Sequence, residues 1–203
     1  MSALRPSKIV CVGRNYAEHA KELGNAVPER PLLFFKPPSS LIATGEAIVL
    51  PAASSRVEHE AEIGVVILER LKGITEAEAA RKTYGFVCVN DVTARDLQKV
   101  DGQWGRAKGF DTFCPVGDTM VEGLDWTTLE VIGRVNGKVV QHGKATDMAF
   151  GVPALVAFLS QVMTLEPGDL IATGTPAGTT RLAKGDITEV EIPGVGVLTN
   201  PVI

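Results

Sequence analysis

The sequence has few cysteines, few aromatic side chains and no long apolar run. Three of its 203 residues are cysteines and 5% are aromatic. An odd number of thiols in unrelated contexts implies no disulfide framework, so we expect Cys11, Cys88 and Cys114 to be reduced. No stretch approaches the roughly 20 apolar residues of a membrane span, and the N-terminus lacks the apolar region of a signal peptide. These absences predict a cytoplasmic protein with no membrane anchor.

Basic residues are fewer than acidic ones. The chain has 20 lysines and arginines against 24 aspartates and glutamates, which gives a net charge of −4. Such a chain lacks the basic surface that nucleic-acid binding needs, so we exclude nucleic acid as its main partner. With 45% hydrophobic residues it can bury one sizeable core, and it shows no repeat, linker or low-complexity tract. We therefore expect a single domain over residues 1–203.

Carboxylates occupy every second position at the start of segment 56–68, and an apolar stretch follows. Side chains alternate faces along a strand, so Glu58, Glu60 and Glu62 would project from one face. An isolated pattern of this kind most often marks a solvated face. Here, however, residues 63–68 have the composition of a strand buried on both sides, and ionised carboxylates at its end would be stabilised by a shared divalent cation.

A third carboxylate ends the next apolar run, residues 84–90. Asp91 would lie at a strand terminus, a common position for chemistry on a rigid scaffold. Two of the glutamates and Asp91 would make a three-carboxylate site. Oxygen ligands of this kind suit Mg²⁺ or Mn²⁺.

For other polar residues the sequence pattern is weaker evidence of a functional role. His19 and Glu22 are three residues apart on a short helix and share a face, a spacing that more often marks a surface pair than a catalytic one. Lys108 lies in the glycine-rich segment 100–113, which could close over a site, although a plain surface charge is the commoner case. Lys36 at a strand end is expected to be solvated, and His142 to be structural.

Local patterns predict a β-rich α+β domain with few, short helices. Asn15 is expected to cap a helix that ends at Gly24, and Thr75 to open another with Glu78. Segment 152–163 is an apolar helix with proline in its first turn. Asn-Gly between alternating runs predicts a type I′ hairpin over 129–141, and the runs 187–192 and 195–198 are expected to pair.

Five blocks of the sequence resemble the fumarylacetoacetate hydrolase family. They are VGRNYAEH at 12–19, HEAE at 59–62, NDVTARDLQ at 90–98, KGFDTFCP at 108–115 and TGTP at 173–176. The chain is most similar to the short acylpyruvase and oxaloacetate decarboxylase branch and to related 2-hydroxyhepta-2,4-diene-1,7-dioate isomerases. The resemblance implies a rolled mixed β-sandwich or barrel with the metal at its mouth, a homodimer and a role in aromatic catabolism.

The same resemblance implies roles for individual residues. The metal, Mg²⁺ or Mn²⁺, would be held by Glu60, Glu62 and Asp91, with Glu58 outside the ligand set. His19 and Glu22 match a water-activating dyad, and Lys108 matches a substrate-facing lysine. The substrate would be held by Arg14, Asn15, Arg95, Gln98 and Thr173. Family members continue Thr-Gly-Thr-Pro with a Gly-Val-Gly-like stretch, whereas this chain has Gly-Thr-Thr at 178–180.

The expected reaction is cleavage of the C3–C4 bond of a 2-oxo acid, such as an acylpyruvate or oxaloacetate, through a metal-stabilised pyruvate enolate. An isomerase would use the dyad only to move protons. A non-catalytic binder of small dicarboxylates is a further alternative. A binder needs no general base, so the complete set of His19, Glu22 and Lys108 argues against it.

Overall fold

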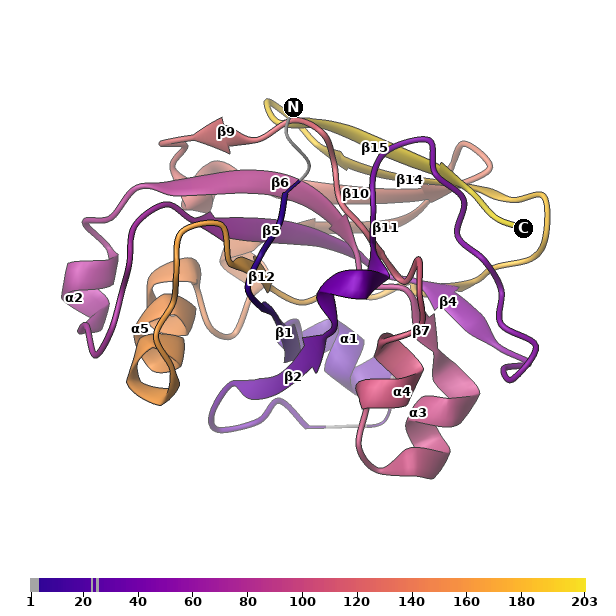
Figure 1. Cartoon of the computed structure of the whole chain (residues 1–203), viewed down its shortest axis with the longest axis horizontal. Helices are drawn as coiled ribbons and strands as arrows, with labels where there is room; N and C mark the ends of the chain where they lie inside the picture. Colours follow the sequence, from indigo (N-terminus) through magenta and orange to yellow (C-terminus); the bar gives the residue numbers. More distant parts are fainter. Residues whose placement is uncertain (1–3, 23, 25) are drawn as a thin grey trace.

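The computed structural model describes residues 4–22, 24 and 26–203, and it is rich in β-structure (Figure 1). Its largest sheet has six strands in the order β2-β1-β12-β5-β6-β9. Only β1 and β12 pair in parallel within it. The strands are β1 (Ile9–Gly13), β2 (Leu32–Lys36), β5 (Ala61–Ile67), β6 (Tyr84–Asn90), β9 (Val121–Glu122) and β12 (Leu170–Ala172).

A second sheet packs against the first. Its order is β11-β10-β14-β15, all antiparallel, with β10 (Glu130–Val135), β11 (Lys138–Lys144), β14 (Ile187–Ile192) and β15 (Gly196–Pro201). The predicted Asn-Gly hairpin joins β10 to β11, with φ of 53° at Asn136 and 75° at Gly137, as a type I′ turn requires. The pairing of the two C-terminal strands is also confirmed.

The main core lies between these two sheets. Because β5 and β6 are buried along their whole length, their apolar side chains supply both faces of the larger sheet. Ile63 of β5 and Phe86 of β6 face Val131 and Val190 of the second sheet. Ile9, Val66 and Leu170 form a second cluster. The sheets are open, so the expected β-rich sandwich is confirmed without closure into a barrel.

Two small sheets complete the β-structure near the polar site. One has the order β13-β4-β7, and the other pairs β3 with β8 in parallel. Their strands are β3 (Leu41–Ile42), β4 (Val57–His59), β7 (Thr93–Ala94), β8 (Cys114–Pro115) and β13 (Thr180–Arg181). The carboxylate segment is therefore two strands rather than the single one expected. They are interrupted at Glu60, whose backbone N–H donates to the Asn90 side chain.

The helices are short, as predicted. They are α1 (Ala17–Glu22), α2 (Glu76–Ala79), α3 (Arg95–Asp101), α4 (Gly105–Lys108) and α5 (Val152–Val162), with 3₁₀ turns at Pro38–Ser40, Trp126–Thr128 and Ala145–Asp147. The capping box of Thr75 and Glu78 is confirmed. Asn15, in contrast, does not cap α1: its side chain bonds Phe150 and the Thr173 carbonyl instead. Across residues 4–22, 24 and 26–203, no helix is long and apolar enough to cross a membrane.

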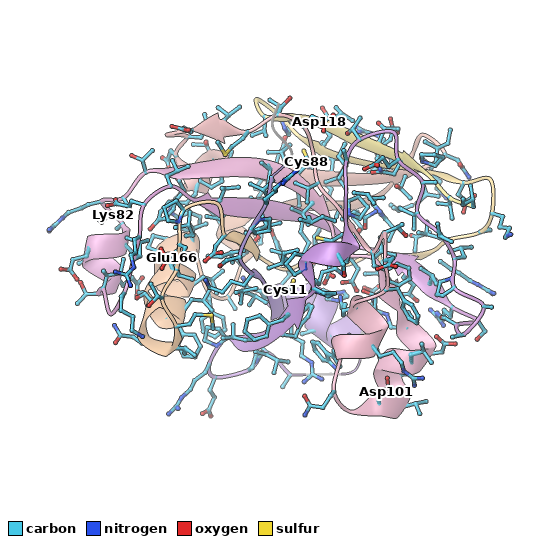
Figure 2. The ribbon with its side chains drawn as sticks, in the orientation of Figure 1. Cys11, Lys82, Cys88, Asp101, Asp118 and Glu166 are labelled. Atoms are coloured by element: carbon cyan, nitrogen blue, oxygen red, sulfur yellow. The ribbon has the colours of Figure 1, made fainter. Side chains whose placement is uncertain are left out.

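The three cysteines are free, as predicted, and all are buried. Figure 2 labels two of them, Cys11 and Cys88. Burial raises the pKa of Cys88 to about 11 and that of Cys114 to about 12. Thiols in such surroundings stay protonated and unreactive at neutral pH. The cysteines therefore serve as small apolar core residues.

Lowering the pH is expected to destabilise the fold through His59. This side chain is fully buried, and within the described residues neither ring nitrogen has a hydrogen-bond partner. Burial lowers its pKa from 6.5 to about 4, against the opposing charge of Glu60. As the pH falls below 6.5, only the unfolded chain gains this proton. The free energy of unfolding should then drop by up to about 1.4 kcal/mol per pH unit until the pH nears 4.

Urea unfolding at pH 7, 6 and 5 would measure this slope. In His59→Leu the same series should be flatter than in the unchanged protein between pH 6 and 5. Equal slopes for the two proteins would show that His59 is not the titrating group.

Candidate active site

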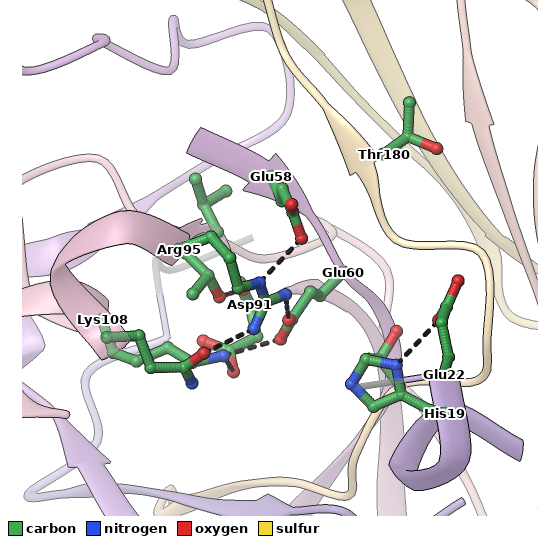
Figure 3. A network of polar contacts seen from close by, with 12 residues as sticks. His19, Glu22, Glu58, Glu60, Asp91, Arg95, Lys108 and Thr180 are labelled. Atoms are coloured by element: carbon green, nitrogen blue, oxygen red, sulfur yellow. Dashed lines mark hydrogen bonds and ion pairs between the residues drawn. The ribbon is translucent and has the colours of Figure 1, made fainter. Parts of the chain in front are cut away.

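A cavity of about 600 Å³ opens beside the ends of β5 and β6. It is lined by predicted residues from several segments: Arg14, His19, Glu22, Glu60, Glu62, Asp91, Arg95, Gln98 and Lys108. Figure 3 shows the polar contacts that connect part of this set. Asn15 and Thr173 are the exceptions, because neither is among the described residues that line the cavity.

Asn15 and Thr173 instead build the wall behind the cavity. Both side chains are completely buried. The Thr173 hydroxyl donates to the Ile63 carbonyl at 2.8 Å, and the Asn15 amide donates to the Thr173 carbonyl, also at 2.8 Å. Their polar atoms are thus engaged in joining the β12–β13 loop to β5 and to the loop before α1. The cavity is reached instead by Thr175, from the same loop, which sequence reasoning missed.

Three carboxylates converge at the bottom of the cavity. Glu60, Glu62 and Asp91 are buried, and each offers an oxygen within 4.8 Å of the others. Glu60 lies between β4 and β5, Glu62 is on β5, and Asp91 directly follows β6. Antiparallel pairing places Ala61 opposite Asn90, which brings the neighbouring carboxylates together. An all-oxygen set of three anionic donors suits a hard divalent cation such as Mg²⁺ or Mn²⁺.

The electrostatics of the three carboxylates are uneven. Burial opposes ionisation of Glu60, but Lys108 and Arg95 outweigh it and lower the pKa of this carboxyl. Burial and the charge of Asp91 raise the pKa of Glu62. Glu62 accepts a hydrogen bond from Gly174 N–H at 2.8 Å, and no ion pair joins it to another described residue. Glu62 is therefore the one cluster carboxylate that no cation among the described residues pairs, and a bound divalent cation would stabilise its ionised form.

Two lysines contact the same cluster from different sides. Lys108 Nζ lies 2.6 Å from Glu60 Oε2 and also contacts Asp91. Its carboxylate neighbours overcome burial and raise the pKa of Lys108, so the ammonium is charged. Lys36 Nζ lies 2.6 Å from Asp91 Oδ1 and 3.2 Å from the Val92 carbonyl.

The expectation that Lys36 is solvated was wrong, because the residue is only 1% exposed. β2 pairs with β1, and Lys36, the last residue of β2, reaches beneath the end of β6. A strand-end lysine gives no sequence signal for such a contact.

Glu58 is not part of the carboxylate cluster, as expected, but it forms ion pairs with two arginines. Its oxygens accept from Arg56 Nε at 2.6 Å and from Arg95 Nε at 2.7 Å. Arg95 also contacts Glu60, and its Nη1 donates to Gln98 at 2.6 Å. Arg95 is thus fixed by two carboxylates and held with one edge against the cavity (Figure 3).

Replacing Glu58 by glutamine is expected to weaken substrate binding without affecting metal binding. The change removes the charge opposite the buried Arg95 guanidinium but leaves the three cluster carboxylates intact. Loss of one charge-assisted hydrogen bond corresponds to a rise in KM of about 10-fold. Steady-state kinetics and an Mn²⁺ titration on the same sample separate the two effects. A parallel loss of Mn²⁺ affinity would instead make Glu58 part of the metal site.

The expected helical pair is formed across the cavity from Lys108. His19 Nδ1 lies 3.3 Å from Glu22 Oε2 on α1. The same carboxylate accepts from the backbone N–H of Gly178, at 3.1 Å to Oε2 and 3.3 Å to Oε1. Glu22 thereby joins α1 to the loop after β12. With Nδ1 directed at Glu22, the ring is held in an orientation that leaves Nε2 able to take a proton.

Known proteins are similar to this chain over nearly its whole length. The sequence profile described as the C-terminal domain of fumarylacetoacetate (FAA) hydrolase matches residues 8–203. An uncharacterised protein of Archaeoglobus fulgidus is 51% identical over 98% of this chain and 79% of its own length. The human mitochondrial oxaloacetate tautomerase FAHD2A is 41% identical over 98% of this chain and 67% of its own length.

Solved structures are also similar to this chain in both fold and sequence. A 5-carboxymethyl-2-hydroxymuconate delta-isomerase from Mycobacterium smegmatis superimposes with a TM-score of 0.91 at 44% identity, over 98% of this chain and 80% of that one. A 2-hydroxyhepta-2,4-diene-1,7-dioate isomerase from Mycobacterium marinum gives 0.90 at 45% identity, over 98% and 75%. The profile match and these relatives cover nearly the whole chain, and the chain therefore belongs to the fumarylacetoacetate hydrolase family.

Proposed function

We propose that the protein is a divalent-metal-dependent enzyme that cleaves the C3–C4 bond of a 2-oxo acid, such as an acylpyruvate or oxaloacetate. One observation carries the proposal: three buried carboxylates and a His–Glu pair line the same cavity. Glu60, Glu62 and Asp91 would hold Mg²⁺ or Mn²⁺. When bound, the ion would supply a Lewis acid that stabilises the negative charge of an enolate.

The residues of the chain account for the remaining steps. In hydrolysis of an acylpyruvate, Nε2 of His19 takes a proton from water, and Glu22 stabilises the resulting imidazolium. The hydroxide attacks C4, and the electrons of the C3–C4 bond pass to the pyruvate fragment as its enolate. Lys108 stabilises oxyanion charge, while Arg95 and Gln98 hold the substrate. Protonation at C3 then gives pyruvate. Oxaloacetate would lose CO₂ at the same bond with no attacking water.

A second candidate, enol–keto isomerisation of a 2-oxo dicarboxylate, is favoured by the relatives. One is named an oxaloacetate tautomerase. Two solved structures are named a 5-carboxymethyl-2-hydroxymuconate delta-isomerase and a 2-hydroxyhepta-2,4-diene-1,7-dioate isomerase. Isomerisation needs the same stabilised enolate but no bond cleavage. His19 would then move a proton between substrate atoms rather than take one from water.

One panel of assays distinguishes these candidates. Mg²⁺-loaded protein is incubated with acetylpyruvate, oxaloacetate, fumarylpyruvate and a hydroxyheptadienedioate, while pyruvate release and enol absorbance are followed. Pyruvate release supports cleavage. Loss of the enol without pyruvate supports isomerisation. If no compound in the panel turns over, both candidates are overturned in favour of a binding protein.

We also propose that residues 1–203 act as one catalytic domain, in a cytoplasmic homodimer. A main hydrophobic core with side chains from both large sheets supports the single domain, and three free thiols are consistent with a reducing compartment. Light scattering of the purified protein would test the dimer.

A further inference from the structure

A row of alternating charged and aromatic side chains runs along one wall of the cavity. Lys108 Nζ lies 4.9 Å from the centre of the Phe34 ring. Phe34 meets Trp104 edge to face, with 5.3 Å between ring centres. The guanidinium carbon of Arg14 lies 5.8 Å from the centre of the Trp104 ring. All four line the cavity, so the row leads from the carboxylate cluster at Lys108 to a second cation at Arg14.

The two cations at the ends of this row differ in their partners. Lys108 is paired with Glu60 and Asp91. Arg14 forms no ion pair with any residue in 4–22, 24 and 26–203. Among the cavity carboxylates, Glu58, Glu60 and Asp91 are paired with other cations, and Glu62 accepts from the Gly174 N–H. The guanidinium of Arg14 is therefore available to an anion that enters the cavity.

The backbone at Arg14 is held in an unusual conformation. Its φ is +58°, a region that residues other than glycine seldom adopt. The preceding Gly13 packs against the indole so closely that a Cβ there would lie 2.6 Å from Trp104 Cζ3. Trp104 therefore fixes both the backbone before Arg14 and the guanidinium that stacks on it. Uncommon backbone conformations of this kind are typical of ligand clamps.

We propose that Arg14, positioned by Trp104, binds the second carboxylate of a 2-oxo dicarboxylate. This inference rests on the proposed function, in which the carboxylate cluster takes the 2-oxo acid end. The planar guanidinium matches a carboxylate with two parallel hydrogen bonds. A substrate with an alkyl tail would shield Arg14 from water and offer it no partner. Arg14 thus selects dicarboxylates over acylpyruvates with a neutral tail, and Trp104 is a positioning residue.

Two unreactive probes of equal chain length test this selection. 2-Oxoadipate carries a distal carboxylate, and 2-oxohexanoate has a methyl group in its place. Binding of each to the Mn²⁺-loaded protein is measured by calorimetry, with no turnover involved. We expect 2-oxoadipate to bind about 10–100-fold more tightly, the range for a charge-assisted hydrogen-bonded pair.

Arg14→Asn should reduce this ratio to near one, and asparagine tolerates the left-handed backbone. Trp104→Leu should reduce it in part while the charge at position 14 remains. Arg81→Gln, an exposed arginine outside the cavity, is the matched control and should keep the full ratio. Thermal melting confirms that each variant is folded.

The outcomes separate the two proposals. Equal affinity of both probes for the unchanged protein would overturn the role of Arg14 and leave the proposed function standing. A ratio that survives in Arg14→Asn would do the same. If neither probe binds, the site does not take 2-oxo acids and both proposals are overturned.

Discussion

Glu60→Gln and Asp91→Asn are each expected to abolish tight Mn²⁺ binding and turnover together. Each substitution removes one of three anionic oxygen donors that lie within 4.8 Å of one another. Loss of an outer-shell partner alone typically costs about 10–100-fold in metal affinity, so loss of a direct ligand should exceed that range. Calorimetric titration of the chelator-treated protein with Mn²⁺ measures the affinity, and addition of Mg²⁺ or Mn²⁺ should restore activity to the unchanged protein only.

Glu58→Gln is the matched control for these variants. Glu58 is a buried glutamate of the same segment and contacts the same Arg95, but it lies outside the carboxylate cluster. It should keep full Mn²⁺ affinity. Undiminished activity in excess chelator, or unchanged Mn²⁺ affinity in Glu60→Gln, would show that the cluster does not serve a metal.

The carboxylate cluster could be anticipated because local rules position its members. The alternation of side chains along a strand relates Glu60 to Glu62, and an apolar run that ends in an acid places Asp91 at a strand terminus. Antiparallel pairing of β5 with β6 then brings these residues together. The spacing rule for helices likewise predicted the contact of His19 with Glu22. Sequence reasoning succeeded where neighbours in the chain determine the geometry.

The contacts that were not predicted join residues far apart in the sequence. Lys36 contacts Asp91 across 55 positions of sequence, and nothing beside it in the chain indicates a buried anion. Asn15 has the residue type of a helix cap, yet its side chain bonds the backbone of Phe150 and Thr173. Arg14 and Trp104 stack across 90 positions. The local sequence around Lys36, Asn15 and Trp104 gives no indication of these distant partners.

His19→Ala is expected to cut hydrolysis of an acylpyruvate by about 10²–10⁴-fold, the usual contribution of a general base. Nδ1 of His19 faces Glu22, so in the proposed mechanism Nε2 would take the proton from water. Metal affinity should stay close to that of the unchanged protein, because His19 is not a member of the carboxylate cluster. The rate of pyruvate release from acetylpyruvate and an Mn²⁺ titration measure the two quantities.

Loss of CO₂ from oxaloacetate requires no attacking water, so His19→Ala should slow it less than hydrolysis. The ratio of the two activities in one purified sample should therefore move toward decarboxylation, and a misfolded sample would lose both alike. Glu22→Gln is expected to have a weaker effect on the same ratio than His19→Ala. Its side chain can still contact His19 and Gly178 but lacks the charge that stabilises an imidazolium, so its ratio should shift in the same direction by a smaller factor. Equal losses of both reactions in folded, metal-loaded His19→Ala would mean that the imidazole positions substrate or transfers a proton to the enolate.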